Sequence, residues 1–457
     1  MTSSSLPSSS LGRIFHYGNL AASLAGGVAA EFVRRNTSQS PDTQQGGLVL
    51  TEANVSRLVA KLSRMRGAAL KLGQFLSIQD AHILPPEVDR IFRRVQDQAH
   101  YMPNHQMEQV MRENLGTDWQ SHFSSFDRLP FASASIGQVH RATLASNGEP
   151  VAVKIQFPGI VDSIGADLAA IGLLLPAARV LPRGLFLERT LKILGQELRE
   201  ECDYTREASW ARSFRQWVGE SEALNLRAPW VWEGSTNRVL VMQFIDGVSV
   251  GGDVVQQLSQ EDRNTIAASI ISLCLHELFV FRAMQTDPNW TNFLWDDKTR
   301  SIGLVDFGAT RQYDTQFIDG WLQLLRAAIA GNEDECIHWS KELGYLTGEE
   351  DELMRKAHIR SMVLLGEPFR ASSSNGFSFA IADNQWQPIM AEIRSMIPTM
   401  LQHRLAPPPR ETLSLNRKLS GAFLLAARLE ARVDCGQLWH KVTDNYVFDS
   451  SARSGTA

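Results

Sequence analysis

Residues 285–308 read QTDPNWTNFLWDDKTRSIGLVDFG, and they decide the fold of this 457-residue chain. Asp287 is followed five positions later by Asn292, and Asp306 opens an Asp-Phe-Gly triplet. The apolar run 302–305 predicts a short strand before that triplet. Mg²⁺ prefers oxygen ligands, which carboxylates and amides supply. The stretch therefore predicts a phosphoryl-transfer site. The alternative is a polar loop that leads into a buried strand capped by a turn Asp.

The spacing is that of protein kinases, in which a loop Asp orients the attacking hydroxyl while an Asn and the DFG Asp hold metal ions. Asp287 is accordingly the candidate catalytic residue, and Asn292 and Asp306 are the candidate metal ligands. Two features depart from the kinase pattern. The residues before the loop Asp are Gln285 and Thr286 instead of His-Arg, and no Ala-Pro-Glu follows DFG. These departures argue against a platform for a peptide substrate.

Residues 130–157 predict a β-hairpin that carries Lys154. Apolar residues alternate with other residues in 151–157, which indicates a half-buried strand, and Asn147-Gly148 supplies the turn. Its VAVK sequence matches the kinase strand whose Lys contacts phosphates, although a lysine on a strand edge is common in proteins of every kind. The preceding loop has small side chains that let backbone N–H groups approach phosphate oxygens. These residues are Ala132, Ser133, Ala134 and Ser135.

A long helix is predicted over 191–217, and a kinase needs one carboxylate from such a helix to fix the strand Lys. Asp203 and Glu207 lie one turn apart on one face, whereas Glu201 points about 200° away from Asp203. Spacing alone does not choose the partner among these acids, and most helix acids are simply solvated. The apolar stretch 238–246 predicts the strand at which a kinase chain crosses between its lobes.

The first hundred residues contain two helix patterns of different character. Small residues recur every fourth position in 18–30, which suits either a membrane-associated helix over 14–33 or a helix packed on the protein. The same face could support a homodimer. Residues 36–50 are a predicted linker. An apolar stripe then predicts a helix over 58–76, whose Lys71, Gly73 and Gln74 lie off the stripe, on what residue spacing alone indicates is a solvated face.

The rest of the chain is predicted to be mainly helical. Further helices are expected at 87–98, 104–115 and 262–284, and helices continue from Gly308 to about residue 446. The segment APPPRE at 406–411 breaks this pattern before a last helical region over 413–444, and the final residues are predicted to be a disordered tail.

Composition excludes several other classes of protein. The hydrophobic content of 44% allows a large core, and the net charge of −5 gives no reason to expect nucleic acid as a partner. Four scattered cysteines share no short spacing, which argues against a zinc site or a disulfide framework and fits a reducing compartment. Residues 1–13 are rich in serine, but no full targeting presequence is evident.

Taken in order, these motifs resemble the UbiB/ADCK family of atypical kinases, and most closely its mitochondrial members that support coenzyme Q (ubiquinone) biosynthesis. The resemblance covers about residues 11–447. KLGQ at 71–74 matches the KxGQ motif, ECD at 201–203 matches ExD, and QTDPNWTN and DFGATR match the catalytic and metal loops. ASAS at 132–135 matches the alanine-rich loop, except that Ser133 replaces the usual Ala.

The resemblance implies an α+β, kinase-like bilobal fold with an added helical KxGQ extension and a mainly helical C-lobe. Five regions are expected. They are an N-terminal segment with the possible membrane helix and linker (1–50), the KxGQ extension (51–125), an N-lobe (126–247), a C-lobe (248–447) and a disordered tail (448–457).

The resemblance also implies roles for individual residues and a cofactor, ATP or ADP with Mg²⁺. Lys154 would contact phosphates and pair with Glu207. Lys71 and Gln74 would cover the site and reach Glu201 and Asp203, an implication that replaces the solvated-face interpretation. The remaining nucleotide-site residues would be Ala132, Ser133, Ala134, Ser135, Met242, Gln243, Phe244 and Ile245.

The implied function is a Mg²⁺-ATP-dependent ATPase or phosphotransferase that supports ubiquinone biosynthesis. It would act on small-molecule lipid intermediates or on the biosynthetic complex, because the KxGQ helix lies where a protein substrate would dock. Implied partners are ubiquinone biosynthesis enzymes and membrane lipids such as cardiolipin, at the matrix side of the inner mitochondrial membrane. The alternatives are a conventional protein kinase and a nucleotide-switched scaffold without turnover.

Overall fold

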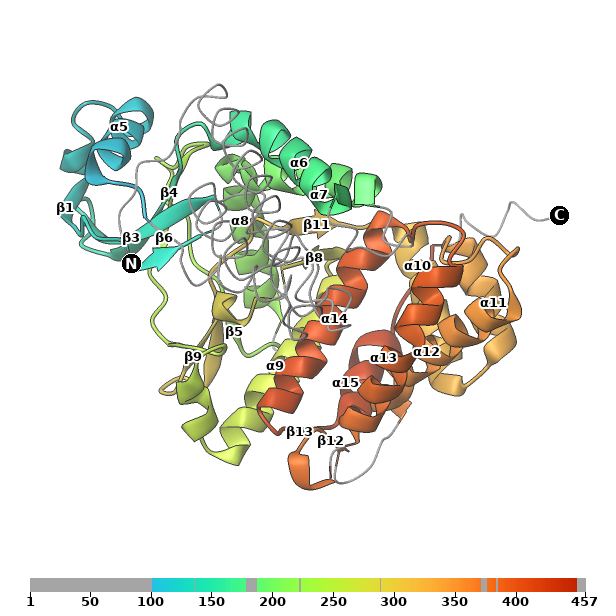
Figure 1. Cartoon of the computed structure of the whole chain (residues 1–457). Helices are drawn as coiled ribbons and strands as arrows, with labels where there is room; N and C mark the ends of the chain where they lie inside the picture. Colours follow the sequence, from blue (N-terminus) through green and yellow to red (C-terminus); the bar gives the residue numbers. More distant parts are fainter. Residues whose placement is uncertain are drawn as a thin grey trace, which may run out of the picture. The chain divides into compact units, whose positions relative to one another are not determined.

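A computed structural model describes residues 101–134, 136–177, 187–221, 223–287, 289–370, 376–383 and 385–449. Several sequence predictions lie outside these residues: the helices at 14–33, 58–76 and 87–98, the linker at 36–50, Lys71, Gly73, Gln74 and Ser135, and the end of the tail. The described chain divides into two compact units. The mixture of helices and small sheets confirms the predicted α+β class (Figure 1).

The first unit contains the described residues up to 177 together with Leu187–Ala208 and Val231–Phe244. Its antiparallel sheet has the order β1-β3-β4-β6, and β2 pairs with β3. The strands are β1 (Phe123–Phe126), β2 (Ala132–Ser133), β3 (Gly137–Leu144), β4 (Pro150–Gln156) and β6 (Val239–Gln243). The helices are α5 (Asn104–Leu115), the 3₁₀ helix η2 (Trp119–His122), α6 (Ile160–Ala177), α7 (Leu187–Glu201) and the start of α8 (Tyr204–Glu220).

Strands β3 and β4 form the predicted hairpin, with Lys154 opposite Val139 on one side and Leu240 of β6 on the other. The prediction of a half-buried strand is wrong, because Lys154 is only 6% exposed and Gln156 only 2%. Gln156 Nε2 donates to the Cys202 carbonyl at 2.7 Å, so the polar face of β4 is covered by the connection between α7 and α8. Alternation of residue types could not show that a second layer lies on that face.

The single helix predicted over 191–217 is in fact two helices, α7 and α8, separated at Cys202–Asp203. Asp203 Oδ1 accepts the backbone N–H groups of Thr205 and Arg206 at 3.0 and 3.2 Å, as an N-cap residue does. The break was not predicted because the apolar periodicity of the sequence continues across it. The Asp203 carboxylate, which caps the first N–H groups of α8, marks where the second helix begins. Helix α5 begins and ends where it was predicted, and α6, which was not predicted, packs against α7.

The second unit contains Ser209–Trp230, which includes the rest of α8, and the described residues from 245 onward. One sheet has the order β5-β10-β9-β7, with β5 parallel to β10 and the other pairs antiparallel. Two further pairs are β8 with β11 and β12 with β13. The strands are β5 (Leu226–Arg227), β7 (Val248–Ser249), β8 (Ala283–Gln285), β9 (Phe293–Asp296), β10 (Ser301–Leu304), β11 (Thr310–Gln312), β12 (Phe377–Ser378) and β13 (Arg432–Val433).

Helix α9 (Gln260–Phe279) is the core helix of this unit, and every residue from Ile270 to Phe279 is buried. It packs against α14 and α15, and α14 lies beside it in Figure 1. The other helices are η4 (Asp253–Gln257), η5 (Trp290–Asn292), α10 (Thr315–Ala330), α11 (Glu333–Glu342), α12 (Glu352–Arg370), η6 (Ile381–Asp383), α13 (Trp386–His403), α14 (Arg410–Arg428) and α15 (Cys435–Thr443).

Two helix predictions in this unit need correction. The helix expected over 262–284 ends at Phe279, because the chain turns at Arg282, which has a φ of +52°, and continues as β8. The helical region expected over 413–444 is divided into α14 and α15 by β13. The break at 406–411 is confirmed between α13 and α14. At the chain end, Asp449 N–H donates to Asp319 at 3.0 Å, so ordered contacts reach into the predicted tail.

All four cysteines are buried and none forms a disulfide. Burial raises the thiol pKa of Cys202 and Cys274 to about 12 and that of Cys336 to about 11. It raises the pKa of the Cys435 thiol as well. Among the described residues, no helix combines the length and apolar character needed to cross a membrane.

Candidate active site

The side chain of Gln285 joins the two predicted catalytic segments within the second unit. Gln285 is the last residue of β8 and lies opposite Thr310 of β11. Its Oε1 accepts the backbone N–H of Asp287, and its Nε2 donates to the Asp306 carbonyl at 3.2 Å. One amide side chain therefore links the candidate catalytic loop to the DFG segment. From the sequence, Gln285 was identified only as one of the two residues that stand in place of the kinase His-Arg pair. Its role in linking the two segments was not predicted.

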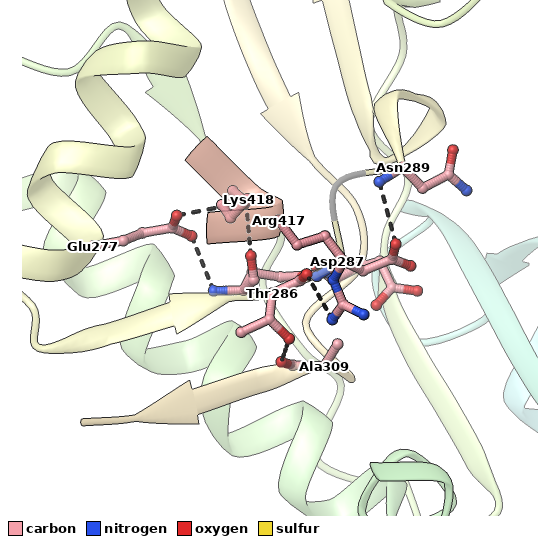
Figure 2. A network of polar contacts seen from close by, with 9 residues as sticks. Glu277, Thr286, Asp287, Asn289, Ala309, Arg417 and Lys418 are labelled. Atoms are coloured by element: carbon pink, nitrogen blue, oxygen red, sulfur yellow. Dashed lines mark hydrogen bonds and ion pairs between the residues drawn. The ribbon is translucent and has the colours of Figure 1, made fainter. Parts of the chain in front are cut away.

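Asp287 lies in a network of short-range hydrogen bonds, part of which Figure 2 shows. Its Oδ1 accepts the Asn289 N–H at 3.2 Å, so Asp287 opens a turn that leads to Asn292. On the other side, Thr286 Oγ1 donates to the Ala309 carbonyl at 2.9 Å. These contacts fix the backbone before and after the carboxylate, which suits a residue that must hold a reacting group in one place.

Asn292 and Asp306 line the same small pocket, of about 10 Å³, which is close to the space that one water molecule needs. The Val305 N–H donates to the Asn292 carbonyl at 3.2 Å, which holds the two segments together, and Asp306 Oδ1 accepts the Gly308 N–H at 3.0 Å. The Asn292 Nδ2 is buried and makes no hydrogen bond within the described residues. The Asp306 carboxylate and the Asn292 side-chain oxygen are ligands of the kind that Mg²⁺ prefers, so these two residues could hold the metal ion.

Sequence reasoning missed three charged residues around the catalytic loop: Glu277 of α9, and Arg417 and Lys418 of α14. Glu277 Oε1 accepts the Gln285 N–H at 3.1 Å, and its Oε2 lies 3.5 Å from Lys418 Nζ. Lys418 also donates to the Gln285 carbonyl at 2.7 Å, and Arg417 donates to the Thr286 carbonyl at 3.2 Å. One signal for this cluster was available in the sequence, namely Glu277, a charged residue within the mostly apolar run 273–279. Because a charge is rarely buried unless it is paired, Glu277 could have indicated a buried cationic partner.

Burial raises the pKa of Glu277 to about 6, although Lys418 and the Gln285 N–H oppose the increase. The folded protein therefore holds this proton at pH values where the unfolded chain has lost it. We expect the contribution of Glu277 to the free energy of unfolding to fall by about 2 kcal/mol as the pH rises from about 4.5 through about 6.

Denaturant titrations at a series of pH values test this effect against the double variant Glu277→Gln/Lys418→Met. The variant has no titrating group at this place and serves as the reference. The difference in unfolding free energy between the two proteins should change across this pH window. Parallel pH profiles for the two proteins would contradict the raised pKa of Glu277.

In the first unit, Lys154 and Glu207 form a buried ion pair. Lys154 Nζ lies 2.7 and 2.9 Å from the two Glu207 carboxylate oxygens, and Glu207 is only 1% exposed. The Lys154 ammonium also lies 5.2 Å from the ring centre of Tyr204. Spacing left three acids as candidate partners, and the structure has the pairing that the family resemblance implied. The break before α8 explains the choice, since it places Glu207 in the first turn of a helix facing β4.

The other two acids have different surroundings. Asp203 caps α8, and Glu201 is the last residue of α7 and is 7% exposed. Their predicted contacts with Lys71 and Gln74 lie outside the described residues. Among the predicted nucleotide-site residues, Ala132 and Ser133 form β2, and the Ala134 N–H donates to the Gly137 carbonyl at 2.9 Å.

Gly137, the first residue of β3 and next to this small-residue loop, has no room for a side chain. A Cβ at this position would lie 2.5 Å from the Ile155 carbonyl oxygen and 2.7 Å from the Tyr204 hydroxyl. The start of β3 therefore lies tightly against β4, close to the residue after Lys154. A larger residue would force the start of β3 away from the strand that carries the candidate phosphate-binding lysine.

The crossing segment also has defined surroundings. Met242 and Gln243 end β6, and the Phe244 N–H donates to the Pro150 carbonyl at 3.0 Å. The Phe244 ring lies under the Arg141 guanidinium, 4.0 Å from the ring centre. Ile245 is buried in the second unit. These contacts fix the backbone of the segment.

The sheet with a buried Lys–Glu pair and the linked Asp-x4-Asn and DFG segments define a kinase-like protein. A family model for the ABC1 atypical kinase-like domain matches residues 94–340, which is more than half of the chain. The chain belongs to this family of atypical kinases, which confirms the resemblance described from its motifs.

Within this family, the chain is similar to mitochondrial COQ8 proteins. It is 46% identical to "Atypical kinase COQ8, mitochondrial" of Schizosaccharomyces pombe, over 98% of this chain and 72% of the relative. The identity is 42% to the COQ8 protein of Saccharomyces cerevisiae (97% of this chain, 86% of the relative) and 42% to "Atypical kinase COQ8B, mitochondrial" of Rattus norvegicus (96% and 82%).

A solved structure shows the same fold at lower sequence similarity. It is that of a Mycobacterium tuberculosis protein in complex with erythromycin. It has a TM-score of 0.56 and 24% identity, and the match covers 86% of this chain and 96% of that one. At this identity the likeness concerns the fold alone.

Proposed function

We propose that this chain is a Mg²⁺-ATP-dependent ATPase or phosphotransferase that supports ubiquinone biosynthesis in the mitochondrion. The observation that carries the proposal is the link made by Gln285, which ties the Asp287 loop to the Asp306 segment beside a pocket lined by Asn292. The names of the relatives, mitochondrial COQ8 atypical kinases, support the compartment and the pathway. The family resemblance supports a place at the matrix side of the inner membrane.

Each site residue then has a chemical task. Asn292 and Asp306 would hold the metal, and Lys154, oriented by Glu207, would contact the nucleotide phosphates. Bound Mg²⁺ offsets negative charge on the phosphates during transfer. Asp287 would orient a water molecule or an acceptor hydroxyl and accept its proton. The Asn289 N–H donates to Asp287 Oδ1 at 3.2 Å and so helps to hold this carboxylate in one orientation.

The acceptor is proposed to be a small lipid intermediate, a component of the biosynthetic complex, or water. After Gly308 only β11 separates the DFG segment from α10, which begins at Thr315. A conventional protein kinase places its peptide platform in this region, up to its Ala-Pro-Glu motif. The short connection supports an acceptor other than a protein in trans. Ubiquinone biosynthesis enzymes and membrane lipids are the proposed partners.

An ATPase assay with and without cardiolipin-containing liposomes tests the proposal, on the intact chain and on a variant that lacks residues 1–35. We expect the liposomes to stimulate the intact chain about fivefold or more, because binding at one site can shift another by this factor. The shortened variant should keep basal activity and lose the stimulation. Nucleotide binding without any turnover would favour the scaffold alternative, and robust phosphorylation of added proteins would favour a conventional kinase.

A further inference from the structure

Helix α14 supplies two adjacent cations to the backbone just before the candidate catalytic Asp. Lys418 Nζ donates to the Gln285 carbonyl at 2.7 Å, and Arg417 Nη2 donates to the Thr286 carbonyl at 3.2 Å (Figure 2). We propose that Arg417 and Lys418 are positioning residues, which hold this backbone so that the Asp287 carboxylate stays in its reactive place. The inference rests on the proposed phosphoryl transfer and adds residues that lie 131 and 133 positions away along the chain.

The geometry explains why two neighbouring residues do this together. Successive carbonyl groups of an extended chain point to opposite sides. Successive residues of a helix point about 100° apart. Arg417 and Lys418 can therefore reach carbonyls on the two sides of the strand end, and together they restrain the two peptide units on either side of Thr286. A single cation would restrain only one carbonyl.

Glu277 completes the attachment from α9. It accepts the Gln285 N–H and lies 3.5 Å from Lys418, so the N–H and the carbonyl of Gln285 are held by the two members of one ion pair. Both members are buried, with Glu277 0% and Lys418 2% exposed. The carboxylate offsets the ammonium charge, which would otherwise repel a divalent cation held at Asp306 in the same pocket.

The same helix contacts the loop again after Asp287. Trp290 Nε1 donates to the Gly421 carbonyl at 3.2 Å, and the Arg428 guanidinium lies 5.5 Å from the centre of the Trp290 ring. Helix α14 therefore holds the catalytic loop on both sides of the acidic residue. The kinase pattern has His-Arg before this Asp. Here that place has two uncharged residues, Gln285 and Thr286, and α14 provides the cations instead.

The test compares ATP turnover, the KM for ATP and hydrogen–deuterium exchange of the peptide covering 283–292. The variants are Arg417→Met, Arg417→Lys and the charge-neutral double variant Glu277→Gln/Lys418→Met, which avoids leaving a buried unpaired charge. Arg326→Met is the matched control, because Arg326 of α10 also donates to a backbone carbonyl, that of Thr443 at 2.9 Å, but far from the loop in sequence and contacts.

We expect Arg417→Met and the double variant to lower kcat by about 10- to 100-fold, because a small displacement of a reacting group costs this much, while KM changes by less than about threefold. Exchange of 283–292 should become faster in both. Arg417→Lys should recover much of kcat, and Arg326→Met should leave kcat and the loop exchange unchanged.

Two results would overturn the positioning role. One is wild-type kcat and wild-type loop exchange in both Arg417→Met and the double variant. The other is an equal loss of kcat in Arg326→Met, which would indicate general destabilisation. If the wild-type chain hydrolyses no ATP, the proposed function fails, and the hydrogen–deuterium exchange of 283–292 alone decides on the positioning role. Faster exchange in Arg417→Met and in the double variant would still support α14 as the element that holds the loop. Unchanged exchange in both variants would reject that role.

Discussion

The Asp306→Asn variant is expected to lose Mg²⁺-dependent nucleotide binding and to turn over ATP about 10³-fold more slowly than the wild type. Asparagine has the shape of aspartate and can still accept the Gly308 N–H through its Oδ1, so the turn after β10 should persist. What the variant loses is the negative charge beside Asn292, on which binding of a divalent cation depends. The expected defect is therefore chemical and not structural.

Nucleotide binding by calorimetry at several Mg²⁺ concentrations, together with an ATPase assay, measures this defect. Asp314→Asn is the matched control. Asp314 likewise accepts a backbone N–H two residues ahead, that of Gln316 at 2.8 Å, but it caps α10, where asparagine serves equally well. The control should behave as the wild type. ATPase activity unchanged by Asp306→Asn would count decisively against the site.

Lys154→Met is expected to have the largest effect on stability. It leaves the Glu207 carboxylate buried without its cation, which costs about 3–5 kcal/mol of unfolding free energy. The double variant Lys154→Met/Glu207→Gln removes both charges and should recover most of that loss, since a buried ion pair is itself close to neutral in free energy. Nucleotide binding and turnover should remain low in both variants, because neither has the ammonium that would contact phosphates.

Denaturant unfolding and nucleotide binding, measured on the same samples, separate the two roles of Lys154. Recovery of stability without recovery of turnover is the expected pattern. If the double variant regained wild-type turnover, the pair would be structural only, and Lys154 would have no part in phosphate binding. If Lys154→Met were as stable as the wild type, the ion pair would be less well formed than its 2.7 Å contact indicates.

The elements that could be predicted from sequence are those whose signals are local. The Asp287 to Asp306 segment, the β3–β4 hairpin and α5 each depend on spacing within about 20 residues, and the structure has them where they were expected. The pairing of Lys154 needed more than spacing. Three acids fit one helix pattern, and the choice depends on the break at Cys202–Asp203, which the apolar periodicity does not reveal.

The support of the catalytic loop could not be predicted for a different reason. Arg417 and Lys418 lie in an amphipathic helix, where charged residues usually face water. Their contact with Gln285 and Thr286 arises only after α14 packs against α9. No local pattern gives the tertiary neighbour of a residue more than 100 positions away. The burial of Lys154 and Gln156 on β4 has the same origin, since a second layer covers that face.

The burial of all four native cysteines has a practical value for studying this protein. With thiol pKa values raised far above neutral pH, they are almost wholly protonated and shielded from alkylating reagents. Two cysteines introduced at exposed positions would therefore be the preferred points of attachment for fluorophores or spin labels. Distance measurements between such labels could follow domain motion during a nucleotide cycle without first stripping the natural thiols from the chain.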